Sequence, residues 1–414
     1  MKLQAATSGA ASLTLQRSLL SSSTGSTPDM PPPPSTAFFL SYPLWMSATF
    51  SFFIGFTIGI LLFFLWWSVV RLSRFVVHRR TLSRILAEEQ APANAATVFS
   101  PMLRHPDTIP FFQHLQHEGL PFLAQIIGRG GCGEVYKAEI FVENRTIPVA
   151  IKKIDHLAAT GAASVCQEES ELLNIHTRQV RSEILTVGRM RHPSLLPLLA
   201  HVPKPDCHYL LYEYMPNGSL HDVLKQRSLQ WPVRYKIALG IAAGLEYLHM
   251  VHRPQVIHRD LKPANILLDC NLNARIGDFG LAKVVHEMMS GTVASNNVAG
   301  TLGYIAPEYY QTMTCTAKCD IYSFGVILAV LVTGRFPSDQ FFQATDEMCI
   351  VGWLRNVLRS ADPAAAIDGR LMGKGFEEQM LLVLKVAYFC TYDDPAERPN
   401  SRDVKLMLSQ IKPY

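Results

Sequence analysis

The chain has 414 residues, of which 48% are apolar, so it is long and apolar enough for one large domain or two ordinary ones, and wholesale disorder is excluded. Lys and Arg total 38 against 34 Asp and Glu, and five arginines between residues 71 and 84 account for the whole excess, because the other 400 residues sum to −1. A nucleic-acid-binding surface would be basic across a domain, so this local charge argues against nucleic acid as a partner.

Residues 1–47 are rich in Ser and Pro and contain few long apolar runs. Arg17 interrupts the only run that could form the apolar part of a cleavable signal peptide. A Ser-rich, acid-poor N-terminus is also typical of a transit peptide, which stays an alternative. We predict a short disordered segment, too poor in apolar residues to form a binding domain.

Residues 48–70 contain no charge and consist mainly of Phe, Ile, Leu and Trp. A helix of these 23 residues would be about 34 Å long, and the hydrocarbon core of a bilayer is about 30 Å thick. The stretch therefore predicts a single transmembrane helix, with Trp66 and Trp67 at one membrane interface. A buried core helix is the alternative, but such helices rarely run so long without a polar face.

The charges on the two sides of this stretch predict its direction. Residues 30–47 carry no charge, and the five arginines follow the stretch within 14 residues. Positive charge favours the cytoplasmic side, so we expect the N-terminus outside and residues 71 onward in the cytosol. The chain is then a single-pass protein of the plasma membrane, with residues 1–47 extracellular. Residues 71–119, basic at first and then rich in Pro and His, are predicted to form a juxtamembrane linker.

Gly55 and Gly59 form a G-x-x-x-G pattern inside the expected membrane span. Two glycines one helical turn apart let a second membrane helix approach closely, so this face is a candidate contact for a partner helix. Glycine is common in membrane helices in any case, and a merely structural role is the alternative.

A glycine-rich loop follows the linker. From Leu120 apolar and polar residues alternate on both sides of a Gly cluster, which predicts strand, tight loop and strand. Gly128, Gly130 and Gly133 form G-x-G-x-x-G, with Val135 two residues on; backbone without Cβ can lie against phosphate oxygens. A dinucleotide-binding fold shares this spacing but needs a helix directly after the glycines. The strand-like EVYKAEIF argues against that alternative.

A lysine that could bind the nucleotide and a glutamate that could pair with it follow the glycine-rich loop. Lys152 ends the V-A-I-K motif on the next predicted strand, where its ammonium would hold the α- and β-phosphates of ATP. Glu183, in a helical segment, is the natural acid to pair with Lys152 and to fix it toward the nucleotide. The alternative is that Glu183 is an exposed helix charge, since Glu168, Glu169 and Glu171 lie on the preceding stretch.

The motif H-R-D-L-K-P-A-N supplies a catalytic loop. Asp260 would accept the proton of a substrate hydroxyl, Lys262 would neutralise the transferring phosphoryl group, and Asn265 would bind Mg²⁺. Asp278 of the D-F-G motif would be the second metal ligand. With A-P-E ending at Glu308, the motifs occur in one order, and they predict phosphoryl transfer from ATP with Mg²⁺ as cofactor.

Over roughly residues 120–412 the chain resembles the eukaryotic protein kinase family. The strings LLYEYMPNGSL, IALGIAAGLEYLH, AGTLGYIAPEYYQT and KCDIYSFGVILAVLVTGRFPSD are similar to plant receptor-like kinases. Within these, the chain looks most like the adaptor-type leucine-rich-repeat receptor-like kinases of the EVERSHED type, although it contains no such repeats.

The resemblance implies an α+β, two-lobed kinase fold, which the single transmembrane helix precedes. The small lobe, residues 120–212, is expected to be strand-rich, and the large lobe, residues 217–412, helical. The hinge would lie at Glu213 to Met215 and contact ATP, and Tyr212 would be the gatekeeper residue.

The sequence also predicts three helices directly. Residues 181–190 form a helical segment in the small lobe, and residues 232–250 carry apolar side chains at helical spacing. Residues 320–334 are almost wholly apolar, as expected of a central buried helix.

The resemblance further implies that Asp320 braces the catalytic loop and that Glu308 pairs with Arg398. Arg259, directly before Asp260, is the arginine that attracts a phosphorylated activation segment in such kinases. The hydroxyls between the D-F-G and A-P-E motifs are its candidate partners: Ser290, Thr292, Ser295 and Thr301. Packing against the catalytic loop is an equal alternative for Thr301.

The resemblance implies a membrane-anchored receptor-like serine/threonine kinase, with tyrosine as a second acceptor type, that acts on protein substrates in plant immunity or development. A receptor-like protein or co-receptor is the expected partner, through Gly55 and Gly59. The alternative is a catalytically weak adaptor with a kinase fold that signals by docking partners. The complete set of catalytic residues favours the enzyme over the adaptor.

Overall fold

The structure is a computed structural model, and it describes residues 55–71, 96–121, 124–130, 133–155, 180, 182–184, 186–188, 190–285, 293–294 and 298–411. The chain divides into two compact units, residues 1–86 and residues 87–414. The description below takes each unit by itself.

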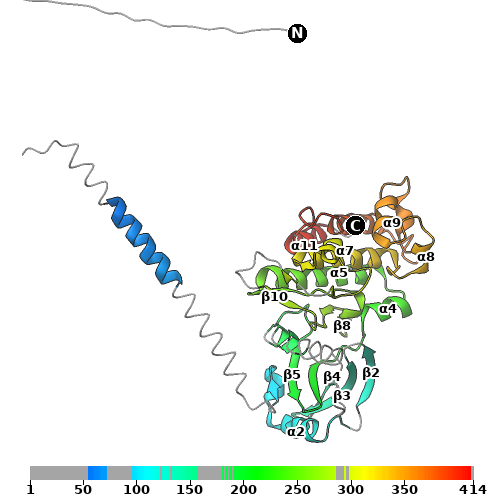
Figure 1. Cartoon of the computed structure of the whole chain (residues 1–414). Helices are drawn as coiled ribbons and strands as arrows, with labels where there is room; N and C mark the ends of the chain where they lie inside the picture. Colours follow the sequence, from blue (N-terminus) through cyan, green and yellow to red (C-terminus); the bar gives the residue numbers. More distant parts are fainter. Residues whose placement is uncertain are drawn as a thin grey trace, which may run out of the picture. The chain divides into compact units, whose positions relative to one another are not determined.

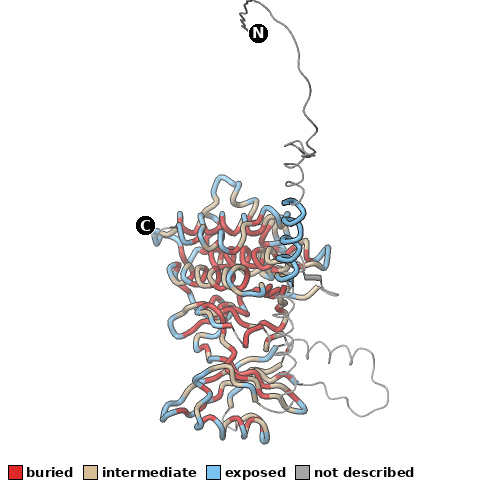
Figure 2. The backbone as a smooth tube through the Cα atoms, turned by 90° about the vertical axis from the view of Figure 1, so that its left-hand side faces the viewer, coloured by how far each residue is buried: buried red, intermediate tan, exposed pale blue. Residues whose placement is uncertain are grey.

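The first unit contains a helix over residues 55–71, drawn in blue in Figure 1. Most of its side chains are exposed, including Leu61, Leu65 and Trp66 (Figure 2). Residues 48–54 of the expected membrane span lie outside the described residues. Within the described part of the chain, no helix combines the length and the apolar character that crossing a membrane requires.

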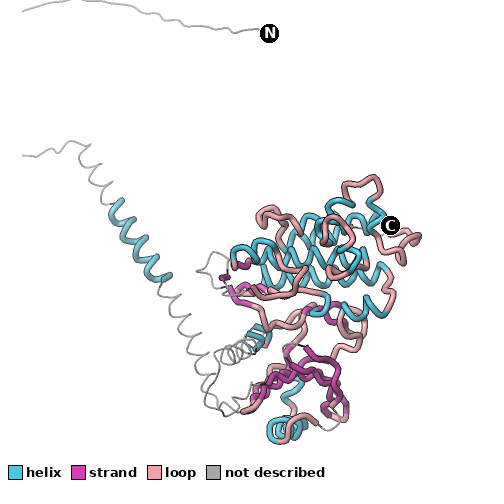
Figure 3. Tube along the Cα trace, turned by 45° about the vertical axis from the view of Figure 1, so that its right-hand side comes forward, coloured by secondary structure: helices cyan, strands magenta, loops and turns pink. Residues whose placement is uncertain are grey.

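The small lobe of the second unit is built on a six-stranded sheet with the order β1-β5-β6-β4-β3-β2. Every neighbouring pair is antiparallel, and Figure 3 shows these strands gathered at one end of the unit. The strands are β1 (Thr97–Val98), β2 (Gln125–Gly130), β3 (Gly133–Val142), β4 (Arg145–Asp155), β5 (Leu198–Pro203) and β6 (Cys207–Glu213). The alternation of apolar and polar residues in β3 and β4 directs Ile140, Val149 and Ile151 into the buried side.

Residues 96–117, which the sequence assigns to the linker, form ordered elements of the small lobe. They contain β1, the 3₁₀ helices η1 (Pro101–Arg104) and η2 (Pro106–Thr108), and α2 (Ile109–His117). Leu103, Phe112 and Leu115 are buried in the apolar cluster of the small lobe. The sequence pattern is weak here because each element is short and buries at most two side chains.

The large lobe is mainly helical. Its central helix α7 (Ala317–Thr333) begins after Thr316, whose hydroxyl accepts the N–H of Lys318, and ends at Gly334 with φ +67. Nearly all of α7 is buried, as its apolar sequence predicts, and α5 (Trp231–Glu246) and α10 (Glu377–Cys390) pack against it. Figure 1 shows α5 and α7 beside each other and α11 (Ser401–Gln410) at their outer side.

The remaining elements complete the large lobe around this core. Its other helices are α4 (Leu220–Gln226), α6 (Pro307–Thr312), α8 (Gln340–Gln343), α9 (Ile350–Val357), α11 (Ser401–Gln410), η4 (Pro263–Asn265) and η5 (Pro363–Ala366), and a π-helical turn, η3 (Tyr247–Val251), extends α5. Three short antiparallel strand pairs join β8 (Ile266–Leu268) to β9 (Ala274–Ile276), β7 (Gln255–Ile257) to β10 (Lys283–Val285), and β11 (Val293–Ala294) to β12 (Thr314–Cys315). The α+β, two-lobed arrangement expected from the sequence is therefore confirmed.

Candidate active site

The glycine-rich loop joins β2 and β3. Gly128 pairs with Val135 and Gly130 pairs with Gly133, so the two strands bring the glycines to one end of the sheet. Gly133 has φ +126, and a Cβ there would lie 2.0 Å from the carbonyl oxygen of Lys153. Only glycine fits that position, and the close approach of β4 is the reason.

Lys152 on β4 contacts two carboxylates. Its Nζ lies 2.7 Å from Glu183 Oε1 and 2.8 Å from Asp278 Oδ1. Glu183 lies on a helical segment whose described residues are 180, 182–184 and 186–187, and it is fully buried. The structure thus joins β4, this helix and the D-F-G motif at one ammonium group.

The three charges shift one another's pKa values. Burial lowers the pKa of Lys152, but the carboxylates of Glu183 and Asp278 raise it more, so it lies above its usual value and the ammonium stays charged. Burial raises the pKa of Glu183, and the charge of Lys152 opposes only part of that effect. For Asp278, burial raises the pKa but Lys152 lowers it more, so the carboxylate remains ionised.

The hinge region follows directly on β6. The hydroxyl of Tyr212, the expected gatekeeper, donates a hydrogen bond of 2.8 Å to Glu183 Oε2. Glu213, the last residue of β6, pairs with Val149 of β4, and Met215 is buried in the core. The expected hinge residues therefore lie at and just beyond the end of β6, the strand that pairs with β4, which carries Lys152.

Asp320 on α7 holds the backbone of the catalytic loop. Its Oδ2 accepts the N–H of His258 at 2.8 Å, and its Oδ1 accepts the N–H of Arg259 at 2.9 Å. His249 Nε2 lies 2.9 Å from the same Oδ2. Burial raises the pKa of Asp320, but the hydrogen bond with His249 and the nearby imidazoles lower it more, so its net shift is downward. Arg259 has φ +71, a strained value that these two backbone bonds hold in place.

The side chains of the catalytic loop form one hydrogen-bonded group. Lys262 Nζ lies 2.9 Å from Asp260 Oδ2, and Asn265 Nδ2 donates to Asp260 O at 2.8 Å and to Asp260 Oδ2 at 3.1 Å. Thr301 donates from Oγ1 to Asp260 Oδ1 at 2.8 Å and accepts from Lys262 Nζ at 2.7 Å. This geometry favours the packing role for Thr301, because its hydroxyl is engaged by both residues.

The D-F-G motif is held by the catalytic loop and by the helix of Glu183. Asp278 has φ +58, and the ring of Phe279 is buried against the imidazole of His258, with 4.9 Å between the ring centroids. Ser182, next to Glu183, donates from Oγ to the carbonyl oxygens of Phe279 at 3.3 Å and Ala282 at 2.6 Å. The helix and the D-F-G segment are therefore bound to each other as well as to Lys152.

Arg259 faces the two ends of the activation segment. Its guanidinium donates to the hydroxyl of Tyr309 and, at 3.4 Å, to the carbonyl oxygen of Leu281. The Tyr309 hydroxyl also accepts the N–H of Ala299 at 3.2 Å. Three of the candidate phosphorylation sites lie outside the described residues: Ser290, Thr292 and Ser295.

Glu308 and Arg398 form a bidentate ion pair. Arg398 Nη1 donates to Glu308 Oε1 at 2.7 Å, and Nη2 donates to Oε2 at 2.6 Å. Arg398 is 1% exposed and also donates to the carbonyl oxygen of Tyr392. The pair fastens the A-P-E motif to the loop before α11.

Residues 123–402 match the protein kinase domain family, which covers more than half of the chain. The chain belongs to the protein kinase family. The kinase is 55% identical over 336 residues to the leucine-rich repeat receptor-like serine/threonine/tyrosine-protein kinase SOBIR1 of Arabidopsis thaliana, over 80% of this chain and 51% of that protein. The expected resemblance to leucine-rich-repeat receptor-like kinases is confirmed.

Two further relatives from Arabidopsis thaliana are receptor kinases by name. The kinase is 42% identical over 294 residues to the leucine-rich repeat receptor-like serine/threonine-protein kinase At1g17230, over 69% of this chain and 25% of the relative. It is 34% identical over 347 residues to the receptor protein-tyrosine kinase CEPR1, over 83% of this chain and 35% of the relative. The kinase thus spans about half of one relative and a quarter to a third of the others.

The family implies ATP and a divalent metal ion, and the residues present fit both. Asn265 turns its Nδ2 toward Asp260, which leaves its amide oxygen without a hydrogen bond from the described residues. Asp278 is ionised, and carboxylate and amide oxygens are the ligands that Mg²⁺ prefers. A Cβ on Gly130 would have no atom within 4 Å, so the backbone of this loop is open to a phosphate, and Lys152 carries the charge that phosphates need.

Several contacts of the kinase were not predicted from the sequence. His249 holds Asp320, Ser182 binds the D-F-G segment, and Tyr309 joins Arg259. No spacing rule within the motifs marks these residues, because each reaches its partner only when distant elements pack together. The alternative acids near Glu183 lie outside the described residues: Glu168, Glu169 and Glu171.

Proposed function

We propose that this chain is a membrane-anchored receptor-like serine/threonine kinase that transfers the γ-phosphoryl group of ATP to protein hydroxyls. The observation that carries the proposal is the simultaneous contact of Lys152 with Glu183 and Asp278, beside the group formed by Asp260, Lys262 and Asn265. In this arrangement the groups expected to bind the nucleotide are in position, and so are the groups expected to act on the substrate.

Each residue then has a role that follows from its charge and its contacts. The backbone of the glycine-rich loop and the ammonium of Lys152 bind the phosphates, and Glu183 fixes the direction of Lys152. Asp260 accepts the hydroxyl proton of the substrate, and Lys262 faces the negative charge of the transferring group. Asn265 and Asp278 would hold Mg²⁺, which neutralises charge on the phosphates when it is bound.

The choice of acceptor hydroxyl is part of the proposal. The relatives' names include serine/threonine, serine/threonine/tyrosine and tyrosine kinases. We propose Ser and Thr as the main acceptors and Tyr as a second type. Ser290, Thr292 and Ser295 are the proposed sites of self-phosphorylation, and a phosphate on one of them would be attracted to Arg259.

The test is phosphate transfer by the full-length chain in detergent, with labelled ATP and Mg²⁺, followed by mapping of the labelled residues. Asp260→Asn should abolish incorporation, whereas Asp346→Asn, at an exposed Asp of the same lobe, should leave it unchanged. ATP binding without incorporation in the unaltered chain would contradict the proposal and would indicate an adaptor that signals by docking partners.

Membrane anchoring is proposed from the sequence of the first unit. The support is the uncharged stretch 48–70, the arginines that follow it, and the exposed apolar side chains of the helix over residues 55–71. We propose the plasma membrane, with the N-terminus outside and the second unit in the cytosol, and signalling in plant immunity or development. Protease protection of an N-terminal tag in sealed membrane vesicles tests the direction. Cleavage of the tag from the cytosolic side would contradict it.

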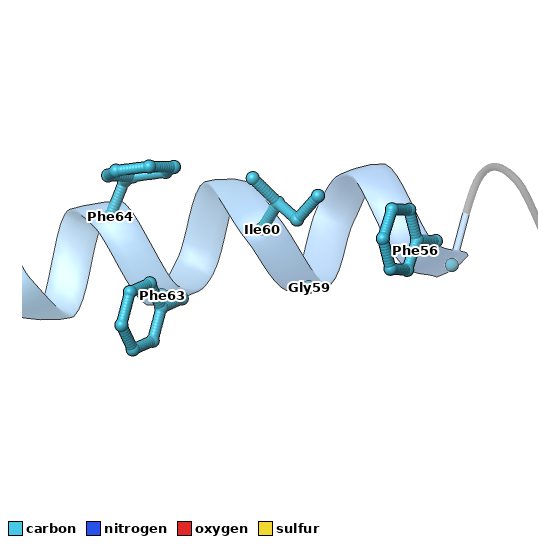
Figure 4. A pocket seen from close by; sticks show the side chains of 6 residues that line it. Phe56, Gly59, Ile60, Phe63 and Phe64 are labelled. Atoms are coloured by element: carbon cyan, nitrogen blue, oxygen red, sulfur yellow. The ribbon is translucent and has the colours of Figure 1, made fainter.

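A partner helix is proposed for the face that contains Gly55 and Gly59. Figure 4 shows Phe56, Ile60 and Phe63 around Gly59, and a Cβ at either glycine would have no atom within 4 Å. A helix of a receptor-like protein or co-receptor would fit against this hollow. Gly59→Leu should weaken co-purification of such a partner, whereas Leu61→Ile should not, and equal recovery with both variants would contradict the proposal.

A further inference from the structure

A short segment before the glycine-rich loop runs along β5 to the helix that carries Glu183. Thr97 and Val98 pair with β5, and the N–H groups of Phe99 and Ser100 both donate to the carbonyl oxygen of Leu199, at 2.9 and 3.0 Å. These four residues, 97–100, are called the strap below. Its course is fixed by two residues paired with β5 and by two backbone hydrogen bonds to the same strand.

The side chain of Phe99 packs against the end of the helix of Glu183. Gly188 closes the last turn, because its N–H donates to the carbonyl oxygen of Ile184 at 3.1 Å. A Cβ on Gly188 would lie 2.6 Å from the carbonyl oxygen of Ile184 and 2.8 Å from Phe99 Cε1, so the ring packs directly against the backbone at the end of the helix. Phe99 and Ile184 also both pack against the main apolar core. The glycine is therefore required both by the carbonyl of Ile184 and by the close approach of the ring.

Arg191 fastens the same two parts by hydrogen bonds. Its Nη2 donates to the carbonyl oxygen of Phe99 at 3.0 Å, and its Nη1 donates to the carbonyl oxygens of Gly188 at 3.2 Å and Met190 at 2.6 Å. A cation at a helix C-terminus stabilises the unpaired carbonyl groups there. One guanidinium thus joins the strap to the end of the helix.

The strap is held firmly on its other side. Leu103, four residues after Phe99, is 1% exposed, and Thr108 donates from its hydroxyl to the carbonyl oxygen of Leu103 at 2.9 Å. Phe112 and Leu115 of α2 are buried in the small lobe. The ring of Phe99 therefore extends from an anchored part of the lobe, which gives the helix end a fixed support.

We propose that Phe99 and Arg191 are positioning residues that keep Glu183 against Lys152. Glu183 fixes Lys152 only while its helix stays close to β4, and the strap holds the end of that helix, five residues beyond Glu183. The inference rests on the proposed function, since it assigns the strap to the control of ATP binding.

The first test compares two phenylalanines of the full-length chain. Phe99→Ala removes the ring at the helix end, and Phe111→Ala removes a ring of α2 that packs on the small-lobe cluster and, among the described residues, not on the main core. We expect Phe99→Ala to raise the KM for ATP about tenfold and to speed hydrogen exchange in residues 180–188. Phe111→Ala should leave both unchanged, and Phe99→Tyr should restore most of the ATP affinity.

A second pair of variants tests the hydrogen bonds of Arg191. It also provides an independent test in case Phe99→Ala does not fold. Arg191→Ala removes the guanidinium from the helix end. Arg104→Ala removes a guanidinium that donates to the strap, to Val98 O at 3.5 Å, and to no part of the helix end that the structure describes. Arg191→Ala alone should raise the KM for ATP. It carries the test if Phe99→Ala does not fold.

Two results would overturn the inference. One is equal KM values and equal exchange rates in Phe99→Ala and Phe111→Ala; the other is a lower melting temperature in Phe99→Ala without a change in KM. If the unaltered chain transfers no phosphate, the proposed function fails separately. The exchange rates of residues 180–188 and the affinity for ATP then still decide whether the strap positions the helix.

Discussion

Tyr212 donates its hydroxyl to Glu183 Oε2 at 2.8 Å, while Lys152 holds Oε1 of the same carboxylate at 2.7 Å. Both oxygens of this fully buried group therefore have a donor. Burial raises the pKa of Glu183, so each donor contributes to keeping the carboxylate ionised. The residue expected at the back of the nucleotide site thus also supports the ion pair that orients Lys152.

Replacement of Tyr212 by Phe should destabilise the fold and weaken ATP binding. The variant keeps the ring but leaves Glu183 Oε2 buried without its donor, which should cost about 1–3 kcal/mol. Urea unfolding and the KM for ATP measure the two effects. Tyr214→Phe is the matched control, because no described residue donates to or accepts from that hydroxyl. Equal unfolding curves for the two variants would show that the hydrogen bond is dispensable.

Replacement of Lys152 by Met should abolish phosphate transfer and lower stability by about 3 kcal/mol or more. Glu183 and Asp278 would then face each other without a counter-charge, and breaking a buried ion pair by removing one partner is costly. Glu183→Gln in the same chain should recover part of the stability but none of the activity. Thermal unfolding and phosphate incorporation are the measurements.

The neighbouring Lys153 provides the control for that experiment. It pairs with Asp155 at 2.8 Å, but Asp155 is 59% exposed, and a pair of this kind contributes about 1 kcal/mol or less. Lys153→Met should therefore unfold close to the unaltered chain and keep its activity. If Lys153→Met lost as much stability as Lys152→Met, the buried ion pairs of Lys152 would not be the cause of the loss.

Arg398→Lys should destabilise the large lobe by about 3 kcal/mol, because lysine cannot make both hydrogen bonds to the carboxylate of Glu308 in a buried site. Arg355→Lys is the surface counterpart. Arg355 also makes two hydrogen bonds to one carboxylate, that of Asp393, which is 75% exposed. The denaturant midpoint should be clearly lower for Arg398→Lys than for Arg355→Lys. Similar midpoints would show that the buried pair contributes no more stability than the exposed one.

Stability should fall in mild acid because of His201 on β5. Burial, with His208 Nδ1 at 3.1 Å from its Nε2, lowers the pKa of His201 from 6.5 to about 4. Between these values the unfolded chain binds more protons than the folded one, so the free energy of unfolding decreases as the pH falls from 6.5 toward 4. The slope is at most about 1.4 kcal/mol per pH unit.

His201→Gln removes this group and should flatten the dependence of stability on pH in that range. Urea midpoints at several pH values between 4.5 and 7 give the slope. His117→Gln, at an exposed histidine of α2, serves as the comparison. If both variants show the slope of the unaltered chain, another group titrates in its place.

Much of the active site could be predicted because its residues lie at fixed positions within short motifs. The order of the glycine loop, Lys152, the catalytic loop and Asp278 indicated which side chains would meet, and the structure brings Lys152, Glu183 and Asp278 together. The apolar run from residue 320 to 334 likewise predicted the central buried helix, which the structure has as α7. Strong local patterns of this kind need no knowledge of distant contacts.

The contacts that the sequence does not predict depend on packing between distant segments. β1 has two residues and pairs with a strand about a hundred residues away, so its own sequence carries no strand pattern. No sequence motif marks Ser182 as a partner of Phe279. Their contact exists because the two lobes meet at the active site. The linker assignment of residues 96–117 missed the ordered elements for the same reason.

The position of β1 has a practical consequence for fragments of this protein. A fragment that begins at Leu120 would lack β1 and α2, which leaves β5 as an open strand edge and uncovers the apolar surface that Leu103 and Phe112 bury. An unpaired edge next to apolar side chains is a template for pairing with another copy of the same fragment. Fragments cut at the glycine-rich loop are therefore expected to aggregate, and those that begin before Ala96 to remain dispersed.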